Sequence, residues 1–245
     1  MLLRRRQMLP CWTLCWILTA SGMAHDAAAD SHHSPVVFGR DDRHIVDTAM
    51  SPWNAIGRVN TTVVAYEFRF CTGFLVAPDT VLTLAQCVAP LKNQPGRLHF
   101  VTGDLRGEYQ EHSIVKCVQI SDDPTADPRT QVARLKLRKA LQAAPLAIIP
   151  AKEIAVGDAV SHAGYGGDRP FVLSADETCH VTGMKGNSLM TDCDTAPGQA
   201  GGPILHSDKK RWRVAAMMAD AREGRGSGGP LASVWQYGLD DLDCD

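Results

Sequence analysis

The sequence has no excess of charge of one sign. Its 245 residues contain 25 Lys plus Arg and 27 Asp plus Glu, which gives a formal net charge of -2. A chain this close to neutral has no basic surface of the kind that binds nucleic acid, so no nucleic-acid partner is expected. The 21 Gly and 14 Pro are also too few for a collagen-like or disordered chain. The composition is therefore that of a globular protein.

Long apolar runs are absent beyond the N-terminus. No later segment reaches the ~18 apolar residues that a membrane helix needs, so no membrane span is expected in the mature chain. At the N-terminus, Arg4, Arg5 and Arg6 precede an apolar stretch at residues 8–20 that is too short to span a bilayer, and small residues follow it. This order is typical of a secretory signal peptide.

We therefore expect residues 1–29 to be a signal peptide, cleaved after Ala24 or Ala29. A buried helix is disfavoured because Pro10 would break it, and a twin-arginine signal is a weaker alternative. Residues 30–35 would be a lead-in or short propeptide, and the protein would be secreted or periplasmic.

Of the eight Cys, two leave with the signal peptide, and Cys71, Cys87, Cys117, Cys179, Cys193 and Cys244 remain. A Cys-x-x-Cys pair is absent and Cys179 directly precedes His180, which suits no tetrahedral zinc site, so no metal is expected. An even number of Cys in an exported chain predicts three disulfides, among fifteen possible pairings.

From residue 55 onward, short apolar or alternating runs recur, bounded by Gly, Pro, Asn or Asp. Runs of this length and spacing predict an all-β sandwich or barrel. The best helical candidate is residues 130–144, although residues 132–137 (VARLKL) also alternate as a strand would. Residues 138–145 have the composition of a connector between two halves of similar size.

Five segments occur in a recognisable order: GRDDRHIVDT (39–48), CTGFLVAPDTVLTLAQCV (71–88), QVARLKL (131–137), GYGGD (164–168) and CDTAPGQAGGPIL (193–205). Together they resemble the chymotrypsin-fold, trypsin-like serine proteases, in particular the bacterial V8-like, or glutamyl-endopeptidase, branch. There the second segment ends in T-A-A-H-C, the third begins D-x-A-L-L-K-L, and the last contains G-x-S-G-G-P.

The resemblance covers roughly residues 36–235. It implies two six-stranded antiparallel Greek-key β-barrels, residues 36–140 and 141–245, with a cleft between them.

The departures from the family pattern fall on the three catalytic positions. Gln86 stands where the family has its general-base His, Gln131 where it has the orienting Asp, and Ala200 where it has the nucleophilic Ser. Asp127 is the one nearby acid that could replace Gln131, but a shifted register would not restore the His or the Ser.

This chemistry requires a hydroxyl, an imidazole that removes its proton, and a carboxylate that orients the imidazole. A methyl group forms no acyl-enzyme, and an amide is no base near pH 7. The family mechanism should therefore be lost. Ser188, Thr191 and Thr195 lie near Ala200 in the sequence but have the setting of strand and turn residues.

The scaffold of the family is retained. The resemblance implies that Cys71 pairs with Cys87. Cys179 and Cys193 bracket an expected hairpin and are expected to pair, which leaves Cys117 for Cys244. The resemblance also implies that Gly198 and Ala200 belong to the tight turn, continued by Gly201, Gly202 and Pro203, that forms the oxyanion hole in active relatives. Here that turn is an anion or carbonyl site, or simply a structural turn.

Residues 212–221 align with the strand that pairs with substrate backbone in the family. Met218 stands at about the place where glutamyl endopeptidases use a His to recognise a substrate Glu, so that preference is not carried over. A strand exposing Ala216, Met217, Met218 and Ala219 could bind an extended peptide by strand addition. Core packing of the same side chains is the alternative.

Three hypotheses follow. The first is an exported pseudoprotease that binds an unknown peptide or protein, needs no cofactor and is a monomer. The second is a hydrolase with residual or rewired activity. The third is a structural secreted domain whose former cleft has no role.

Overall fold

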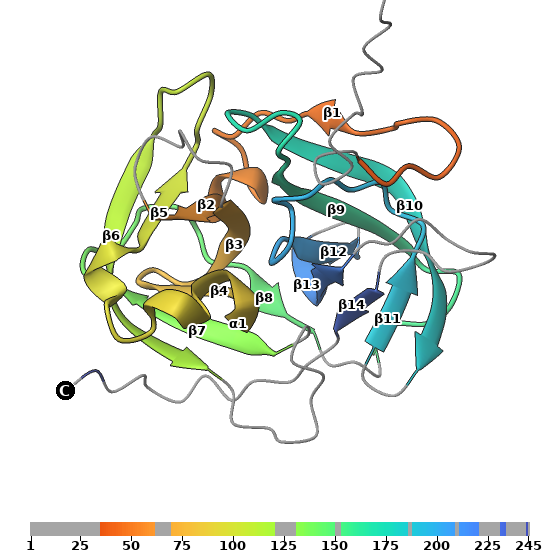
Figure 1. Ribbon diagram of the computed structural model, residues 1–245. Coiled ribbons are helices and arrows are strands. Elements are labelled where there is room, and N and C mark those ends of the chain that lie inside the picture. The colour runs from red at the N-terminus through yellow and green to blue at the C-terminus, as the bar shows by residue number, and fades with distance from the viewer. Residues whose placement is uncertain are drawn as a thin grey trace, which may run out of the picture.

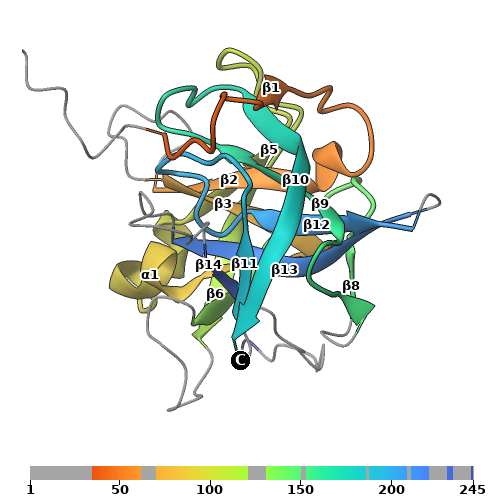
Figure 2. The ribbon, with the colours of Figure 1, turned by 90° about the vertical axis from the view of Figure 1, so that its right-hand side faces the viewer.

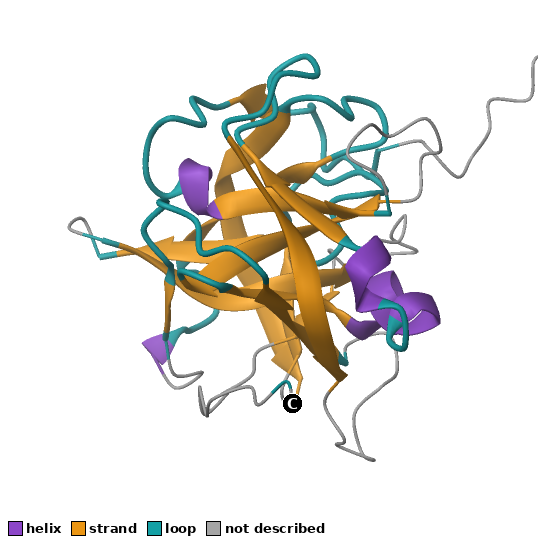
Figure 3. Cartoon of the chain, turned by 90° about the vertical axis from the view of Figure 1, so that its left-hand side faces the viewer, coloured by secondary structure: helices purple, strands orange, loops and turns teal. Residues whose placement is uncertain are grey.

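The computed structural model describes residues 35–61, 70–120, 131–149, 153–185, 188–208, 211–220, 231–233 and 244. The predicted signal peptide, most of the predicted lead-in and Asp127 lie outside these residues. The regular secondary structure of the described chain is mainly β-strand, with a few short helical turns and long connecting loops (Figure 3). No helix among these residues has both the length and the apolar character that crossing a bilayer requires.

The first half of the chain forms a closed barrel in the order β2-β3-β4-β7-β6-β5 (Figure 1). Its strands are β2 (Ile56–Asn60), β3 (Phe70–Ala77), β4 (Thr80–Leu84), β5 (His99–Thr102), β6 (Glu111–Ile120) and β7 (Val132–Leu137). The short helical elements are α1 (Ala85–Val88) and the 3-10 turns Trp53–Ala55, Ala89–Leu91 and Pro95–Arg97. Because β7 pairs with both β4 and β6, the VARLKL segment is a strand and the helical alternative is wrong.

The second half forms an eight-stranded sheet that contains β1 (His44–Ile45), β8 (Ala147–Ile148), β9 (Ala159–Tyr165), β10 (Leu173–Lys185), β11 (Ser188–Thr191), β12 (Pro203–Ser207), β13 (Trp212–Asp220) and β14 (Leu231–Ser233). The long β10 pairs with β9 along its first part and with β11 along its second (Figure 2), and each pairing contains a shift of register. Since β9 also pairs with β12, the strands β9 to β14 make a ring of six. The predicted double-barrel fold is therefore confirmed.

The segment before the first barrel packs on the second half. Val36 and Thr195 exchange two backbone hydrogen bonds of 2.7 and 3.0 Å, and β1 pairs with β10. The carboxylate of Asp194 also accepts hydrogen bonds from the N–H groups of Phe38 (2.7 Å) and Asp42 (2.8 Å). The sequence-based boundary, which placed residues 36–140 in the first barrel, is wrong for residues 36–46, because these long-range bonds draw them to the other half.

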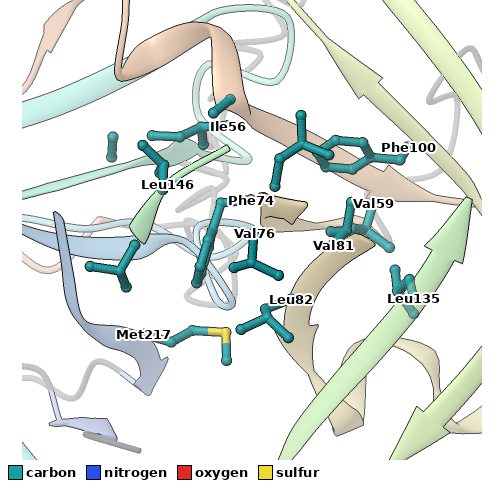
Figure 4. Packing of buried hydrophobic residues seen from close by; sticks show 14 of the residues in the cluster. Ile56, Val59, Phe74, Val76, Val81, Leu82, Phe100, Leu135, Leu146 and Met217 are labelled. Atoms are coloured by element: carbon teal, nitrogen blue, oxygen red, sulfur yellow. The ribbon is translucent and has the colours of Figure 1, made fainter. Parts of the chain in front are cut away.

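The main apolar core runs from the first barrel into the second. Phe74, Leu82 and Leu146 lie close to Met217 of β13 in this core, and all four side chains are buried (Figure 4). A second cluster, which includes Met218 and Cys179, fills the other barrel. The two barrels therefore share packing at the strands that border the turn around Ala200.

Three disulfides are present among the described residues, Cys71–Cys87, Cys117–Cys244 and Cys179–Cys193, which are the pairings expected from the sequence. The first ties the start of β3 to α1, and the third closes the β10–β11 hairpin. The second joins β6 to residue 244, so that it closes a loop of more than half the chain.

Candidate functional site

The turn at residues 196–202 has a backbone that only glycine fits at two places. Gly198 has a φ of +99° and Gly201 a φ of +86°, values that side-chain-bearing residues rarely adopt. A Cβ on Gly201 would also collide with the carbonyl oxygen of Thr72 and the hydroxyl of Thr83. The turn therefore lies directly against β3 and β4 of the first barrel.

Gln199 holds this turn from within. Its side chain is fully buried, and its Oε1 accepts a 2.8 Å hydrogen bond from the Ala196 N–H. Its Nε2 donates to the carbonyl of Gly164 (2.9 Å) and to the hydroxyl of Ser174 (3.2 Å). All of these bonds are internal to the second barrel, so Gln199 fixes the turn and is not available to a ligand.

Thr72 attaches the same turn to the first barrel. Its backbone N–H donates to the carbonyl of Ala200 at 2.9 Å, and its hydroxyl donates to the carbonyl of Gly198 at 3.0 Å. The same hydroxyl accepts a hydrogen bond from the N–H of Tyr165 at 3.0 Å. Thr72 was not among the site residues predicted from the sequence, although its place directly after Cys71 in the CTGF segment was the available signal.

Gln86 and Gln131 are linked through the short helix α1 (Ala85–Val88). α1 starts directly after β4, and Gln86 on it is exposed, with its Nε2 donating to the carbonyl of Ala219 across the barrel junction at 3.4 Å. The carbonyl of Gln131, at the start of β7, accepts a 2.8 Å hydrogen bond from the N–H of Ala85. The structure therefore places the backbone of Gln131 beside the residue that precedes Gln86, and Gln86 beside β13, the strand to which Gly201 of the turn also bonds.

The side chains of Gln86, Gln131 and Ala200 carry no charge and include no acid or base. Two are amides, which neither accept a proton near pH 7 nor carry charge, and the third is a methyl group. The groups offered here are hydrogen-bond donors and acceptors only. The described residues also contain no group of three His, Cys, Asp or Glu side chains arranged to hold a metal ion.

The strand β13 passes the site, but its side chains are not the lining of a cleft. Ala216, Met217, Met218 and Ala219 are all buried, Met217 and Ala219 in the larger core and Ala216 and Met218 in the smaller. Because the strand runs between two cores, its alternate side chains are buried on both faces. Of the two sequence-based alternatives, core packing holds for these side chains, and what β13 presents to Gln86 is the backbone carbonyl of Ala219.

The structure also pairs two residues that the sequence left apart. The hydroxyl of Thr195 and Nε2 of His162 are 3.3 Å apart, and Nδ1 of His162 is 3.2 Å from the carbonyl of Pro203. Both side chains are buried, and burial lowers the pKa of His162 to about 4. The pair is a buried structural contact in which the imidazole is a weak base with no open approach.

An ionic cluster supports the N-terminal segment beside the turn. The Arg43 guanidinium contacts Asp41 (2.9 Å) and Asp168 (2.8 Å), and Asp41 also contacts Arg169 (3.1 Å). The hydrogen bond from Arg43 lowers the pKa of Asp41, whereas burial raises the pKa of Asp194. These carboxylates are engaged by their own neighbours, on the side of the turn that faces residues 35–43.

Comparison with known structures supports the fold assignment. The secreted serine protease VesC from Vibrio cholerae superposes with a TM-score of 0.63 at 14% identity, over 78% of this chain and 45% of that one. The structure of a Glu endopeptidase in complex with MPD superposes with a TM-score of 0.65 at 20% identity, over 81% of this chain and 94% of that one. This chain thus spans less than half the length of VesC.

Residues 71–217, more than half of the chain, match the trypsin-like peptidase domain family. This segment begins at Cys71, ends at Met217, and contains Gln86, Gln131 and the turn at Ala200. The match, the double barrel and the position of the turn between the two halves agree. The chain belongs to the trypsin-like peptidase domain family.

Proposed function

We propose that the protein is an exported trypsin-like protease homologue that binds a peptide or protein segment without hydrolysing it. The observation that carries this proposal is Ala200. It occupies the tight turn between Gly198 and Gly201, where the serine proteases that the sequence resembles have their nucleophile. A methyl group there cannot attack a carbonyl carbon.

The neighbours of Ala200 support the same conclusion. Gln86 and Gln131 supply amides where the resemblance places the base and the orienting acid, so a nucleophile brought to this site would have no proton acceptor. The turn itself is fully built, with Gln199 inside it and Thr72 behind it. An ordered turn that lacks the hydroxyl, the base and the acid is better suited to binding a peptide than to hydrolysing it.

A rewired hydrolase is the rival, and the Thr195–His162 pair is the arrangement closest to a hydroxyl and its base. Both groups are buried, the pKa of His162 is lowered to about 4, and the second ring nitrogen faces a backbone carbonyl. A peptide bond would have to enter the packed interior to reach Thr195. We therefore assign this pair to the structure of the second barrel.

The test compares the disulfide-bonded protein with its Ala200→Ser variant, using casein as substrate and a fluorophosphonate as active-site probe. Both proteins should leave casein intact, and the wild type should remain unlabelled because it has no hydroxyl at position 200. Cleavage by the wild type that scales with protein concentration through purification would overturn the proposal. Ala200→Gly, which adds no hydroxyl, is the matched control for any change seen with serine.

A further inference from the structure

Two histidines lie side by side on the outer face of the first barrel. His99 on β5 and His112 on β6 are diagonal neighbours, because His99 is paired with Ile114 and His112 with Val101. Both lie on the face opposite to that of Phe100, which belongs to the apolar core. The two strands are adjacent on the left of the first barrel in Figure 1. Both histidines are partly exposed, so a small ion can reach them from solvent.

The two imidazole rings meet through their nitrogen atoms. Nδ1 of His99 is 2.8 Å from Nε2 of His112, and the ring planes differ by 14° with their centroids 5.0 Å apart. Rings with these values lie edge to edge, so one nitrogen donates a proton and the other accepts it. Imidazole nitrogens are also the commonest metal ligands in proteins.

The separation of the two nitrogens matches that of neighbouring ligands on one metal ion. Two nitrogens at right angles, each ~2.0 Å from the ion, are ~2.8 Å apart, whereas two tetrahedral ligands are ~3.3 Å apart. The observed 2.8 Å therefore suits a square-planar or tetragonal site. This geometry is typical of Cu²⁺ and Ni²⁺ with nitrogen and oxygen ligands, and Cu²⁺ is the more tightly bound of the two.

A metal ion would take the place of the shared hydrogen bond. Each ring turns slightly, so that the lone pairs of Nδ1 of His99 and Nε2 of His112 face the ion. The proton that lay between the rings moves to the other nitrogen of the ring that carried it. Each ring then keeps one proton and stays neutral, so at pH 7.5, where an ordinary imidazole is mostly neutral, binding neither takes up nor releases a proton.

A buried amide lies beside the two histidines. Asn60 on β2 is directly opposite His99 in the pairing of β2 with β5, so the two side chains share one face. Asn60 is only 3% exposed, and within the described part of the chain neither its Oδ1 nor its Nδ2 has a hydrogen-bond partner. A buried polar group without a partner is uncommon and is explained by a missing water or ion.

The surroundings of this group add no net charge from the nearest ion pair. Arg58 lies two residues before Asn60 on the same face, and its guanidinium is 2.7 Å from the carboxylate of Asp104. The ring of Tyr109 packs edge-on against His112, with the centroids 5.9 Å apart. The group consists of two His and one amide, so it differs from the sets of three His, Cys, Asp or Glu that are absent among the described residues.

We propose that His99, His112 and Asn60 form a binding site for a divalent transition-metal ion, with Cu²⁺ the ion that the geometry favours. Nδ1 of His99 and Nε2 of His112 would take adjacent positions, Oδ1 of Asn60 a third, and water the others. The alternative is a purely structural hydrogen bond between the rings, which leaves the buried amide of Asn60 unexplained. The site is separate from the turn at Ala200 and does not depend on the proposed peptide binding.

The test adds Cu²⁺ alone, in steps up to three equivalents, to the ¹⁵N-labelled, disulfide-bonded protein at pH 7.5. Because Cu²⁺ is paramagnetic, it broadens the backbone amide signals of the residues near it. We expect the signals of residues 99–102 and 111–114 to lose half their intensity at a lower Cu²⁺ concentration than those around His44 and His180, two exposed histidines elsewhere. Signals around His44 or His180 that disappear before those of β5 and β6 would overturn the proposal.

Three variants test the ligands. His99→Gln and His112→Gln each remove one nitrogen, and each should weaken Cu²⁺ binding at β5 and β6 at least tenfold, because loss of even an outer contact of a metal ligand costs about 10–100-fold. Asn60→Ala should weaken the same binding, and affinity equal to that of the wild type would remove Asn60 from the site. His180→Gln is the matched control and should bind like the wild type.

The same amide spectra show whether each variant is folded. Wild-type affinity in folded His99→Gln and His112→Gln would overturn the proposal. If a variant does not fold, the order in which the wild-type signals broaden still decides, because that measurement needs no substitution.

Discussion

Thr72 on β3 and Ala200 in the turn of the second barrel are joined by a backbone hydrogen bond of 2.9 Å, from the N–H of Thr72 to the carbonyl of Ala200. With the bond from the Thr72 hydroxyl to Gly198, it makes the turn part of the contact between the two barrels. The turn therefore contributes to the stability of the fold whatever its chemistry. This explains why its glycines remain in a chain that has no serine at position 200.

Replacing Thr72 by Val should destabilise the protein. The change conserves shape but leaves the buried N–H of Tyr165 and the carbonyl of Gly198 without the hydroxyl. Each lost partner costs about 1–3 kcal/mol, so we expect the free energy of unfolding, measured by urea denaturation, to fall by about 2–4 kcal/mol. Thr72→Ser, which keeps the hydroxyl, is the control and should lose about 1 kcal/mol. Equal losses of unfolding free energy in both variants would show that the hydrogen bonds of the Thr72 hydroxyl do not contribute to stability.

His162 should make stability fall in mild acid. Burial lowers its folded-state pKa to about 4, whereas an unfolded His titrates near 6.5. Between these two pH values His162 is protonated in the unfolded chain but neutral in the folded protein. The contribution of His162 to the free energy of unfolding is therefore complete above pH ~6.5 and is lost as pH falls towards ~4. The loss should reach about 3 kcal/mol over that window.

The measurement is the unfolding free energy of wild type and His162→Gln at several pH values from 4 to 7. The difference between the two proteins should shrink as the pH falls, because Gln does not titrate. His180→Gln, at an exposed His, should run parallel to wild type. A constant difference between wild type and His162→Gln would contradict the assigned titration.

Much of the fold could be predicted from the sequence because its signals are local. The alternation in VARLKL reflects a strand paired on both sides, and the disulfides follow segments whose order matches a known family. The turn at Ala200 was predictable for the same reason, since its glycines are required by a φ above zero.

Other features depend on contacts distant in the chain. The Asp194 carboxylate accepts hydrogen bonds from Phe38 and Asp42, which lie more than 150 positions away in the sequence. No local pattern indicates which of the two barrels these residues pack against. Met217 and Met218 were ambiguous because burial on both faces of a strand looks the same as an apolar cleft. The Thr195–His162 contact depends on how the segment between β11 and β12 packs against β9, which the sequence alone does not determine.

The buried ion pair Arg58–Asp104 allows a test of how much a buried charge costs when its counterion is removed. Their side chains are 1% and 2% exposed and 2.7 Å apart, and Arg58 also donates to the carbonyl of Pro170 in the second half. Burial lowers the pKa of Arg58 and raises that of Asp104. Asp104→Asn should therefore cost about 3–5 kcal/mol of unfolding free energy, because the guanidinium keeps its charge but loses its counterion.

The double variant Arg58→Met, Asp104→Leu separates the charge from the packing. It should be more stable than Asp104→Asn alone, since neither partner is then a buried ion. Asp79→Asn, which breaks a partly exposed pair with Lys136, is the control and should cost less than ~1 kcal/mol. A double variant no more stable than Asp104→Asn would mean that the pair's other contacts dominate.

Efficient hydrolysis should return only when all three substitutions are combined. Ala200→Ser supplies a hydroxyl but no base, and Gln86→His supplies a base whose ring nothing orients. In an intact triad, loss of the Ser or the His costs about 10⁶ in kcat and loss of the Asp about 10⁴, because the groups act as a unit. We therefore expect no turnover from either single variant, weak turnover from the pair, and about 10⁴-fold more after Gln131→Asp is added. Casein hydrolysis across the series measures this, with Ala200→Ser, Gln94→His and Gln131→Asp combined as the matched control that lacks the base. A triple variant as inactive as that control would show that the backbone around Gln86, Gln131 and Ala200 no longer holds the geometry of its active relatives.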